Sequence, residues 1–259
     1  MKKVVAILIP IYKEVVNNTE LLSLTQCLKT LYHYPIIFFA PQSLNTEFYE
    51  SFCEGKVSFS IERFENIYFK NIDGYNQLML STSFYKRFLN YKFILIYQLD
   101  AFVFKDELLY WCNQNYDFIG APHSPVKNLP GEFQFLKNYG LFLEQINIIF
   151  KIKHEVSNVG NGGLSLRKTR SFYFLTRILK HKVKKADKWN EDGFFKYWGN
   201  LFYPFFRLPA DEIALKFSIE TNPKESLEKL NYTLPFGCHA FEKYDWETWK
   251  PFIINDISI

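Results

Sequence analysis

The chain lacks any apolar run close to the roughly 20 residues needed to span a bilayer, so any membrane attachment would be peripheral. Its start, MKKVVAILIPIYKE, carries charge like a signal peptide, but the apolar core covers only residues 4–10 and no small-residue cleavage site follows. This start therefore predicts the first strand of the fold. The expected location is the cytoplasm, with the inner face of the membrane as the other option.

Paired cysteines are also missing. Cys27, Cys53, Cys112 and Cys238 are scattered, with no CxxC pair and no regular spacing. This pattern argues against a zinc knuckle and against a disulfide framework. It favours buried free thiols in a reducing compartment.

Glycine and proline are scarce, at 11 residues each, and the surplus of positive charge is small. Thirty-one basic and 27 acidic residues leave a net charge of +4, which does not argue for a nucleic-acid partner. Hydrophobic residues make up 48% of the chain, with 28 Phe and 17 Tyr, so disorder is excluded as its main character. A chain of 259 residues is long enough for one large domain with a substantial core.

The first hundred residues alternate between strand and helix patterns. Residues 4–9, 36–40 and 93–97 are apolar runs typical of buried parallel strands, and residues 57–61 alternate like a shorter strand. Residues 18–31, capped at Asn18 or Thr19, and residues 73–89 show helical spacing. Strand, helix and strand in this order predict an open α/β sheet covered on both faces. Ligands of such sheets lie beyond the carboxyl ends of the strands, which places Tyr12 to Glu14 and Gln98 to Asp100 at the predicted site.

The second half is less regular. We expect helices over 106–114, 169–179, 191–198 (capped by Asn190) and 211–217, and strands over 116–120 and 164–166. Residues 121–157 read as a long irregular binding or lid segment. The basic run KHKVKKADK at 180–188 predicts a solvated face, with a diphosphate lid or a patch for anionic lipid as lesser alternatives.

Two stretches offer ligands for a divalent cation. Asp100 follows an apolar strand, where burying a carboxylate without a partner is costly, and His239 lies in PFGCHAFEKYD. Carboxylate oxygens favour Mg²⁺ or Mn²⁺, and an imidazole suits Mn²⁺. Taken singly, Asp100 also fits a turn cap and His239 a hydrogen-bonded core residue.

Two further stretches fit sugar binding and proton transfer. In Asn161-Gly162-Gly163, adjacent glycines would let a ligand approach backbone amides, although a tight turn explains them equally well. Arg167 nearby would face a phosphate or only water. Glu191 and Asp192 begin a helix, whose dipole favours charged carboxylates able to act as a base or simply stabilises the helix end.

Seven segments spread over nearly the whole chain together resemble the DUF5672 family: ILIPIYKE, GYNQLMLSTSFYKRF, ILIYQLDAFVF, YDFIGAP, NGGLSLRK, NEDGFF and PFGCHAFEKYDW. That family looks like a bacterial group of glycosyltransferases of the GT-A fold. The resemblance implies one GT-A-like domain over 1–259 with a Rossmann-type, mostly parallel central sheet covered by helices on both faces. Its nucleotide-sugar-binding half would be 1–102 and its acceptor-binding and catalytic half 103–259.

The same resemblance implies roles for individual residues. Asp192 would be the catalytic base with Glu191 assisting, and transfer would invert the anomeric carbon. Asp100 and His239 would hold Mn²⁺ or Mg²⁺, although Gln98 stands where the family's DxD motif has its first Asp. The nucleotide-sugar site would comprise Pro10, Tyr12, Glu14, Tyr75, Asn76, Gln98, Leu99 and Asp100, and the sugar-binding residues would be Asn161, Gly162 and Gly163.

The sequence thus predicts an inverting glycosyltransferase of cell-surface polysaccharide synthesis. It would move a sugar from a nucleoside diphosphate sugar, with a UDP-sugar favoured, to a hydroxyl of a glycan or lipid-linked saccharide. The alternative is a non-catalytic carbohydrate-binding protein on the same fold, which Gln98 keeps open. A glycoside hydrolase using Glu191 and Asp192 is disfavoured, because neighbouring residues seldom flank a glycosidic bond at the required separation of about 5–9.5 Å.

Overall fold

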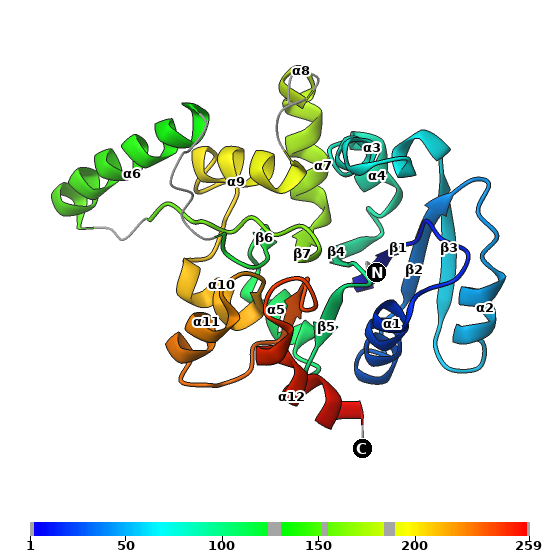
Figure 1. Cartoon of the computed structure of the whole chain (residues 1–259). Helices are drawn as coiled ribbons and strands as arrows, with labels where there is room; N and C mark the ends of the chain where they lie inside the picture. The colour runs from blue at the N-terminus through cyan, green and yellow to red at the C-terminus, as the bar shows by residue number, and fades with distance from the viewer. Residues whose placement is uncertain (1–2, 124–130, 152–154, 184–189, 258–259) are drawn as a thin grey trace.

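A computed structural model describes residues 3–123, 131–151, 155–183 and 190–257. Its centre is a six-stranded sheet in the order β3-β2-β1-β4-β7-β6, with helices on both faces (Figure 1). Strand β7 runs antiparallel to β4 and β6, while the other neighbouring pairs are parallel. The expected mostly parallel α/β sheet is confirmed. The strands are β1 (Lys3–Pro10), β2 (Ile36–Pro41), β3 (Phe59–Phe64), β4 (Tyr91–Tyr97), β6 (Phe118–Ile119) and β7 (Leu164–Lys168).

Alternation along each strand divides the core into two layers. In β1, Val5, Ile7 and Ile9 face one layer, while Ala6 and Leu8 face the other. The first layer is closed by α1 (Asn18–Thr30), α2 (Glu47–Cys53) and α5 (Leu108–Gln114). The second is closed by the 3₁₀ turn η1 (Asn66–Phe69) and by α3 (Ile72–Met79), α4 (Thr82–Arg87), α7 (Thr169–Ile178), α8 (Lys180–Val183) and α9 (Glu191–Leu201), while α10 (Asp211–Phe217) contributes to both layers.

A second, three-stranded sheet lies beyond the end of β4. Its order is β5 (Ala101–Val103), β9 (Gly237–His239) and β8 (Ser218–Ile219). Helices α11 (Pro223–Lys229) and α12 (Trp246–Ile257) pack on it around Phe102, Cys238 and Trp249. This sheet was not anticipated, because strands of two or three residues are too short to show a periodic pattern.

Three elements differ from the sequence-based expectation. The helix expected over 73–89 is two helices, because the Ser81 hydroxyl accepts a hydrogen bond from the Phe84 N–H at 3.1 Å and starts α4. The segment expected to be irregular contains α6 (Gly131–Phe150), in which Phe135, Tyr139 and Leu143 recur at helical spacing. The strand expected over 116–120 is only the two residues of β6.

Two further properties of the described residues follow the sequence. The four cysteines are free and buried, as expected. No helix in the described ranges is both long and apolar enough to traverse a bilayer.

Candidate active site

A cleft of about 700 Å³ opens between the carboxyl ends of β1 and β4. At this point the sheet changes direction, because β2 and β3 follow on one side of β1 and β4 lies on the other side. Of the predicted site residues, only Glu14 does not line it; Glu14 is exposed on the loop after β1. The remaining predicted residues come from six separate stretches of the chain and share this one cleft. They are Pro10, Tyr12, Tyr75, Asn76, Gln98, Leu99, Asp100, Asn161, Gly162, Gly163, Glu191, Asp192 and His239.

His239 lies between two carboxylates on one wall of the cleft. Its Nε2 is 3.1 Å from Asp100 Oδ1, and its Nδ1 is 3.1 Å from Glu220 Oε1. Strand β9 pairs with β5, directly after Asp100, and this pairing brings the imidazole to the first carboxylate. Although burial lowers the pKa of His239, hydrogen bonds to Asp100 and Glu220 raise it overall to about 9. Burial raises the pKa values of both carboxyls, but His239 lowers them overall.

Glu220 was not singled out in the sequence, although a usable signal exists there. It directly follows β8, as Asp100 closely follows β4, so an acidic residue just after a strand marks both positions. Because β8 has only two residues, its sequence does not show it to be a strand. Asn161 Nδ2 lies 2.8 Å from His239 Nδ1, and hydrogen bonding from Asn161 also lowers the pKa of Glu220.

The residues on this wall fit a divalent cation. Asp100 Oδ1 and Gln98 Oε1 lie 3.1 and 3.2 Å from His239 Nε2, so a carboxylate, an amide oxygen and an imidazole nitrogen converge. This donor set suits Mn²⁺ or Mg²⁺ when completed by phosphate oxygens. Across the described ranges, no group of three or more His, Cys, Asp or Glu side chains is arranged around one metal position. The protein alone would therefore supply only part of the coordination shell.

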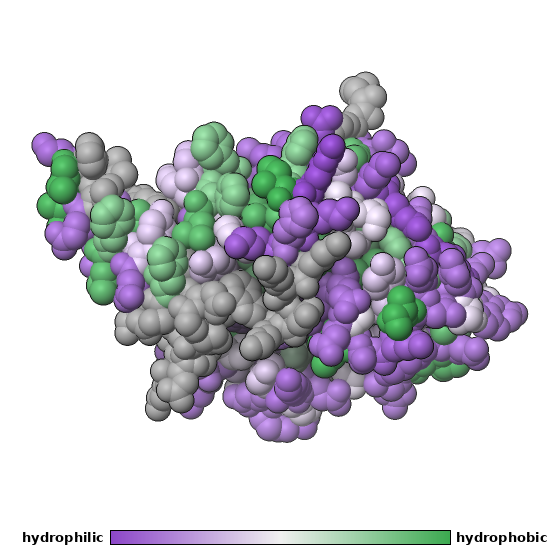
Figure 2. Space-filling model, turned by 90° about the horizontal axis from the view of Figure 1, so that it is seen from above, coloured by the Kyte–Doolittle hydropathy of each residue, from purple (hydrophilic) through white to green (hydrophobic). Residues whose placement is uncertain are grey.

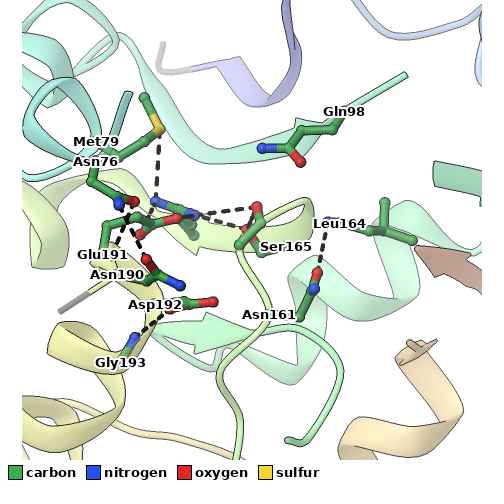
Figure 3. Close-up of polar contacts among 12 residues, drawn as sticks. Asn76, Met79, Gln98, Asn161, Leu164, Ser165, Asn190, Glu191, Asp192 and Gly193 are labelled. Carbon is green, nitrogen blue, oxygen red and sulfur yellow. Dashed lines mark hydrogen bonds and ion pairs between the residues drawn. The ribbon is translucent and has the colours of Figure 1, made fainter. Parts of the chain in front are cut away.

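Asp192 stands on the opposite wall, at the start of α9. Its Oδ1 accepts a hydrogen bond from the Gly193 N–H at 2.6 Å, and its side chain is 17% exposed (Figure 3). Burial, and then the negative charge of Glu191, raise the pKa of Asp192 to about 7. Desolvation thus opposes the helix dipole, which favours the charged form of this carboxyl. A carboxyl with this pKa is suited to accept a proton near neutral pH.

His123 is the second residue that the sequence did not reveal. Its Nε2 lies 3.6 Å from Asp192 Oδ2, and its ring packs over Gly160. Burial, followed by the charge of Lys196, lowers the pKa of His123 to about 4. The ring is therefore neutral at neutral pH, so the pair is a close approach of a neutral imidazole to a carboxyl rather than a salt bridge.

Glu191 and Arg167 form a buried ion pair behind Asp192. Arg167 Nη2 is 2.7 Å from Glu191 Oε1, and Nη1 is 3.1 Å from Oε2. Tyr85 Oη and Ser165 Oγ accept further hydrogen bonds from the guanidinium at 2.9 and 3.0 Å. Neither option expected for Arg167 is correct, since it faces neither phosphate nor water. Of these two neighbouring acids, Glu191 is thus engaged with Arg167, which leaves Asp192 as the candidate base.

Asn76 holds the first turn of α9 from outside. Its Nδ2 donates to Asn190 Oδ1 at 3.3 Å, and its Oδ1 accepts from the Glu191 N–H at 3.2 Å (Figure 3). The side chain of Asn190 itself makes no capping hydrogen bond, contrary to expectation. A residue of α3 therefore satisfies a backbone donor that the helix leaves open and sets the position of Asp192.

The adjacent glycines have a structural reason specific to this cleft. A Cβ on Gly162 would overlap the Glu191 carboxylate, and one on Gly163 would overlap the His239 imidazole. Any side chain here would displace a group of either wall. The glycines therefore allow the two walls to approach each other across the backbone.

The cleft also has aromatic and basic lining residues. Tyr12, which is exposed, and Tyr75 line it, and Tyr75 stacks on Phe39. Lys70 and Lys243 also line the cleft. Aromatic faces and ammonium groups suit a nucleobase and a diphosphate, respectively.

Solved structures with this fold are glycosyltransferases. Mouse xyloside xylosyltransferase 1 in its apo form matches with a TM-score of 0.51 and 10% identity, over 90% of this chain and 96% of that one. The apo structure of the bifunctional glycosyltransferase WbbM gives a TM-score of 0.55 and 14% identity, over 99% of this chain but only 50% of that one. Core-mannan synthase A from Aspergillus fumigatus, in a Mn/GDP form, gives 0.49 at 14% identity, over 81% and 71% of the two chains. The matches to xyloside xylosyltransferase 1 and WbbM show that the fold is of the GT-A glycosyltransferase type.

The sequence itself identifies the family. The model of DUF5672, described as a protein of unknown function, matches residues 58–239. Because this match covers well over half of the 259 residues, the chain belongs to the DUF5672 family. No curated protein sequence matches it.

Proposed function

We propose that the chain is an inverting glycosyltransferase that uses a nucleoside diphosphate sugar as donor. The observation that carries this proposal is the arrangement of the two cleft walls. One wall has the carboxyl of Asp192, whose pKa is raised to about 7, and the other has the convergent Asp100 and His239. The glycosyltransferase folds of xyloside xylosyltransferase 1 and WbbM agree with this proposal.

In the proposed reaction, the Asp192 carboxylate takes the proton of an acceptor hydroxyl. The acceptor oxygen forms a bond to the anomeric carbon as the bond from that carbon to the diphosphate oxygen breaks, and the electron pair leaves with the nucleoside diphosphate. A single displacement of this kind inverts the anomeric configuration. Asn76, through its hydrogen bonds to the first turn of α9, holds Asp192 in place for this step.

Asp100, His239 and Gln98 would hold a divalent cation, Mn²⁺ or Mg²⁺. When bound, such an ion supplies positive charge that stabilises the departing diphosphate. Lys70 and Lys243 add positive charge at the same cleft. A UDP-sugar is the first donor to test, and the proposed acceptor is a glycan or a lipid-linked saccharide of cell-surface polysaccharide.

Asp192→Asn tests the proposal directly. The amide is nearly the same size as the carboxyl but cannot accept the proton, so we expect transfer to fall by about 10²–10⁴-fold while donor affinity stays within about twofold. Transfer is measured with a panel of nucleotide sugars and Mn²⁺, donor affinity by calorimetry, and product configuration by proton NMR. Unchanged turnover in Asp192→Asn, or retention of configuration, would contradict the assignment.

A carbohydrate-binding protein without catalysis is the second candidate, because Gln98 supplies an amide where a first carboxylate is expected. That candidate requires glycan affinity with no nucleotide affinity. Transfer or donor hydrolysis with Mn²⁺ rejects it.

A further inference from the structure

Helix α6 presents an apolar face to solvent. Its exposed apolar side chains are Phe135, Leu141, Phe142, Ile148 and Ile149, and the last two are 74% and 70% exposed. At about 100° per residue, these positions share one side of the helix. The polar members of the same side, Asn138 and Gln145 among them, carry no charge.

Among the described residues, helix α6 packs mainly on α9. Phe135 and Tyr197 bring α6 against α9 with ring centroids 6.5 Å apart, and Leu143 is buried. The remainder of the helix projects away from the body of the molecule (Figure 1). An apolar helix face of this length is rarely left in contact with water unless it binds something.

Helix α7, on the other side of α9, exposes a face that combines apolar and basic residues. Phe174 and Ile178 are exposed there, with Arg170 and Arg177 at the adjoining helical positions. Lys180 and Lys182 follow in α8, and residues 169–183 contain no Asp or Glu. Figure 2 shows the molecule from above, the side on which α6, α7 and α8 lie in Figure 1. Apolar side chains follow α6 at the left, and others lie near the middle of this face beside hydrophilic side chains.

We propose that α6 and the exposed face of α7 with α8 form a surface that binds a lipid bilayer containing anionic phospholipid. An apolar helix side can enter the boundary between headgroups and acyl chains, while neighbouring cations contact anionic headgroups. A second copy of this chain fits the surface less well. Two-fold pairing would bring the basic faces of α7 and α8, which contain no Asp or Glu, toward the same faces of the other copy, where like charges repel.

Vesicle co-sedimentation of the full chain tests the surface. The chain should bind phosphatidylcholine vesicles containing phosphatidylglycerol more strongly than pure phosphatidylcholine, and added salt should weaken that binding. Replacing Ile148 and Ile149 together by Ser should weaken it at least about tenfold, since apolar burial is lost. Arg177→Gln with Lys180→Gln should remove most of the preference for phosphatidylglycerol.

The matched controls lie on other elements. Leu109→Ser replaces a partly exposed apolar residue of α5, and Lys229→Gln replaces an exposed cation of α11. Both should bind vesicles like the unmodified chain, and thermal unfolding should show that all variants are folded. Equal binding by the α6 variant and the unmodified chain, or no binding by the unmodified chain, would overturn the proposal. A dimer in solution that the α6 variant disrupts would assign the surface to a second copy and would also overturn it.

The bilayer surface stands apart from the transfer reaction, because the vesicle assay contains no nucleotide sugar. That the acceptor is carried on a lipid rests on the proposed function. Vesicle binding without transfer would support the bilayer-binding surface and contradict the proposed glycosyltransferase function. Transfer to a soluble glycan without vesicle binding would support the proposed function and contradict the bilayer-binding surface.

Discussion

Asp192 and His239 line the same cleft, and the pKa values of both are raised, for different reasons. For Asp192, burial and the charge of Glu191 disfavour the ionised form. For His239, the carboxylates of Asp100 and Glu220 favour the ionised form and outweigh burial. The site thus combines a carboxyl that is only partly ionised at neutral pH with an imidazole that two carboxylates keep protonated. A cation that binds His239 Nε2 would have to displace the proton there.

The pH dependence of transfer should follow Asp192. Because only the carboxylate accepts a proton, kcat/KM should rise about tenfold per pH unit below pH 7 and level off above it. Steady-state rates across the acid and neutral range, at saturating Mn²⁺, measure this profile. A rate independent of pH through this range would contradict the role of Asp192.

The stability of Asp192→Asn gives a readout that needs no substrate. The pKa of the Asp192 carboxyl is about 7 in the folded protein and ordinarily 3.8. Its contribution to stability is therefore fully present below pH 3.8 and is lost as pH rises through about 7. The Asn variant escapes this loss, so its gain in Tm should be larger at pH 8 than at pH 4. The exposed Asp73→Asn serves as the control and should show no such difference.

Glu220 should control metal affinity without being a ligand. Its contact with His239 Nδ1 fixes the ring and directs Nε2 toward Asp100 and Gln98. Losing an outer carboxylate of this kind typically costs about 10–100-fold in metal affinity. Calorimetric titration with Mn²⁺ should show such a loss for Glu220→Ala and none for Glu225→Gln, which changes an exposed acid on α11. Equal Mn²⁺ affinity in both variants would remove Glu220 from this role.

At the scale of elements, the ion pair of Arg167 and Glu191 joins β7 to α9. The guanidinium is completely buried, and the rings of Phe118, Phe172 and Phe195 surround it. Two hydrogen bonds join the Arg167 guanidinium to the Glu191 carboxylate. The Tyr85 hydroxyl accepts another hydrogen bond from the guanidinium. The first turn of α9, and with it Asp192, therefore depends on a contact in the core.

Glu191→Ala should be strongly destabilising, since it leaves the Arg167 charge buried without its carboxylate. The expected loss is about 3–5 kcal/mol, measured by urea unfolding. The double variant Arg167→Met with Glu191→Leu should recover most of that stability, because both charges are removed together. A stability of Glu191→Ala close to that of the unmodified chain would show that the pair does not secure α9.

For the whole molecule, the position of the cleft follows from topology. β1 leads to β2 and β3 on one side, and β4 returns on the other side, so the carboxyl ends of β1 and β4 leave a gap between them. The small β5-β9-β8 sheet then closes one wall of that gap. A ligand bound there would contact residues from both ends of the chain, Pro10 to Lys243.

A ligand at this cleft should therefore stabilise the entire fold. With UDP and Mn²⁺ at about 100 times their dissociation constants, binding adds about 2.7 kcal/mol to the free energy of unfolding and raises Tm. In the unmodified chain, the increase in Tm with UDP should be larger when Mn²⁺ is present. In His239→Ala the Mn²⁺-dependent part should disappear, and an equal Tm increase with and without Mn²⁺ would argue against a metal at this wall.

The sequence by itself determined the strands of the first half and the edge at which a ligand would lie. Continuous apolar runs specify buried parallel strands, and polar residues after Pro10 and Tyr97 mark their ends. Tertiary structure decided what each charged residue contacts. The sequence around Arg167 does not reveal its burial against Glu191, and the sequence around Glu220 does not reveal its contact with His239. Such pairs, and the desolvation of their charges, depend on elements that only packing brings together.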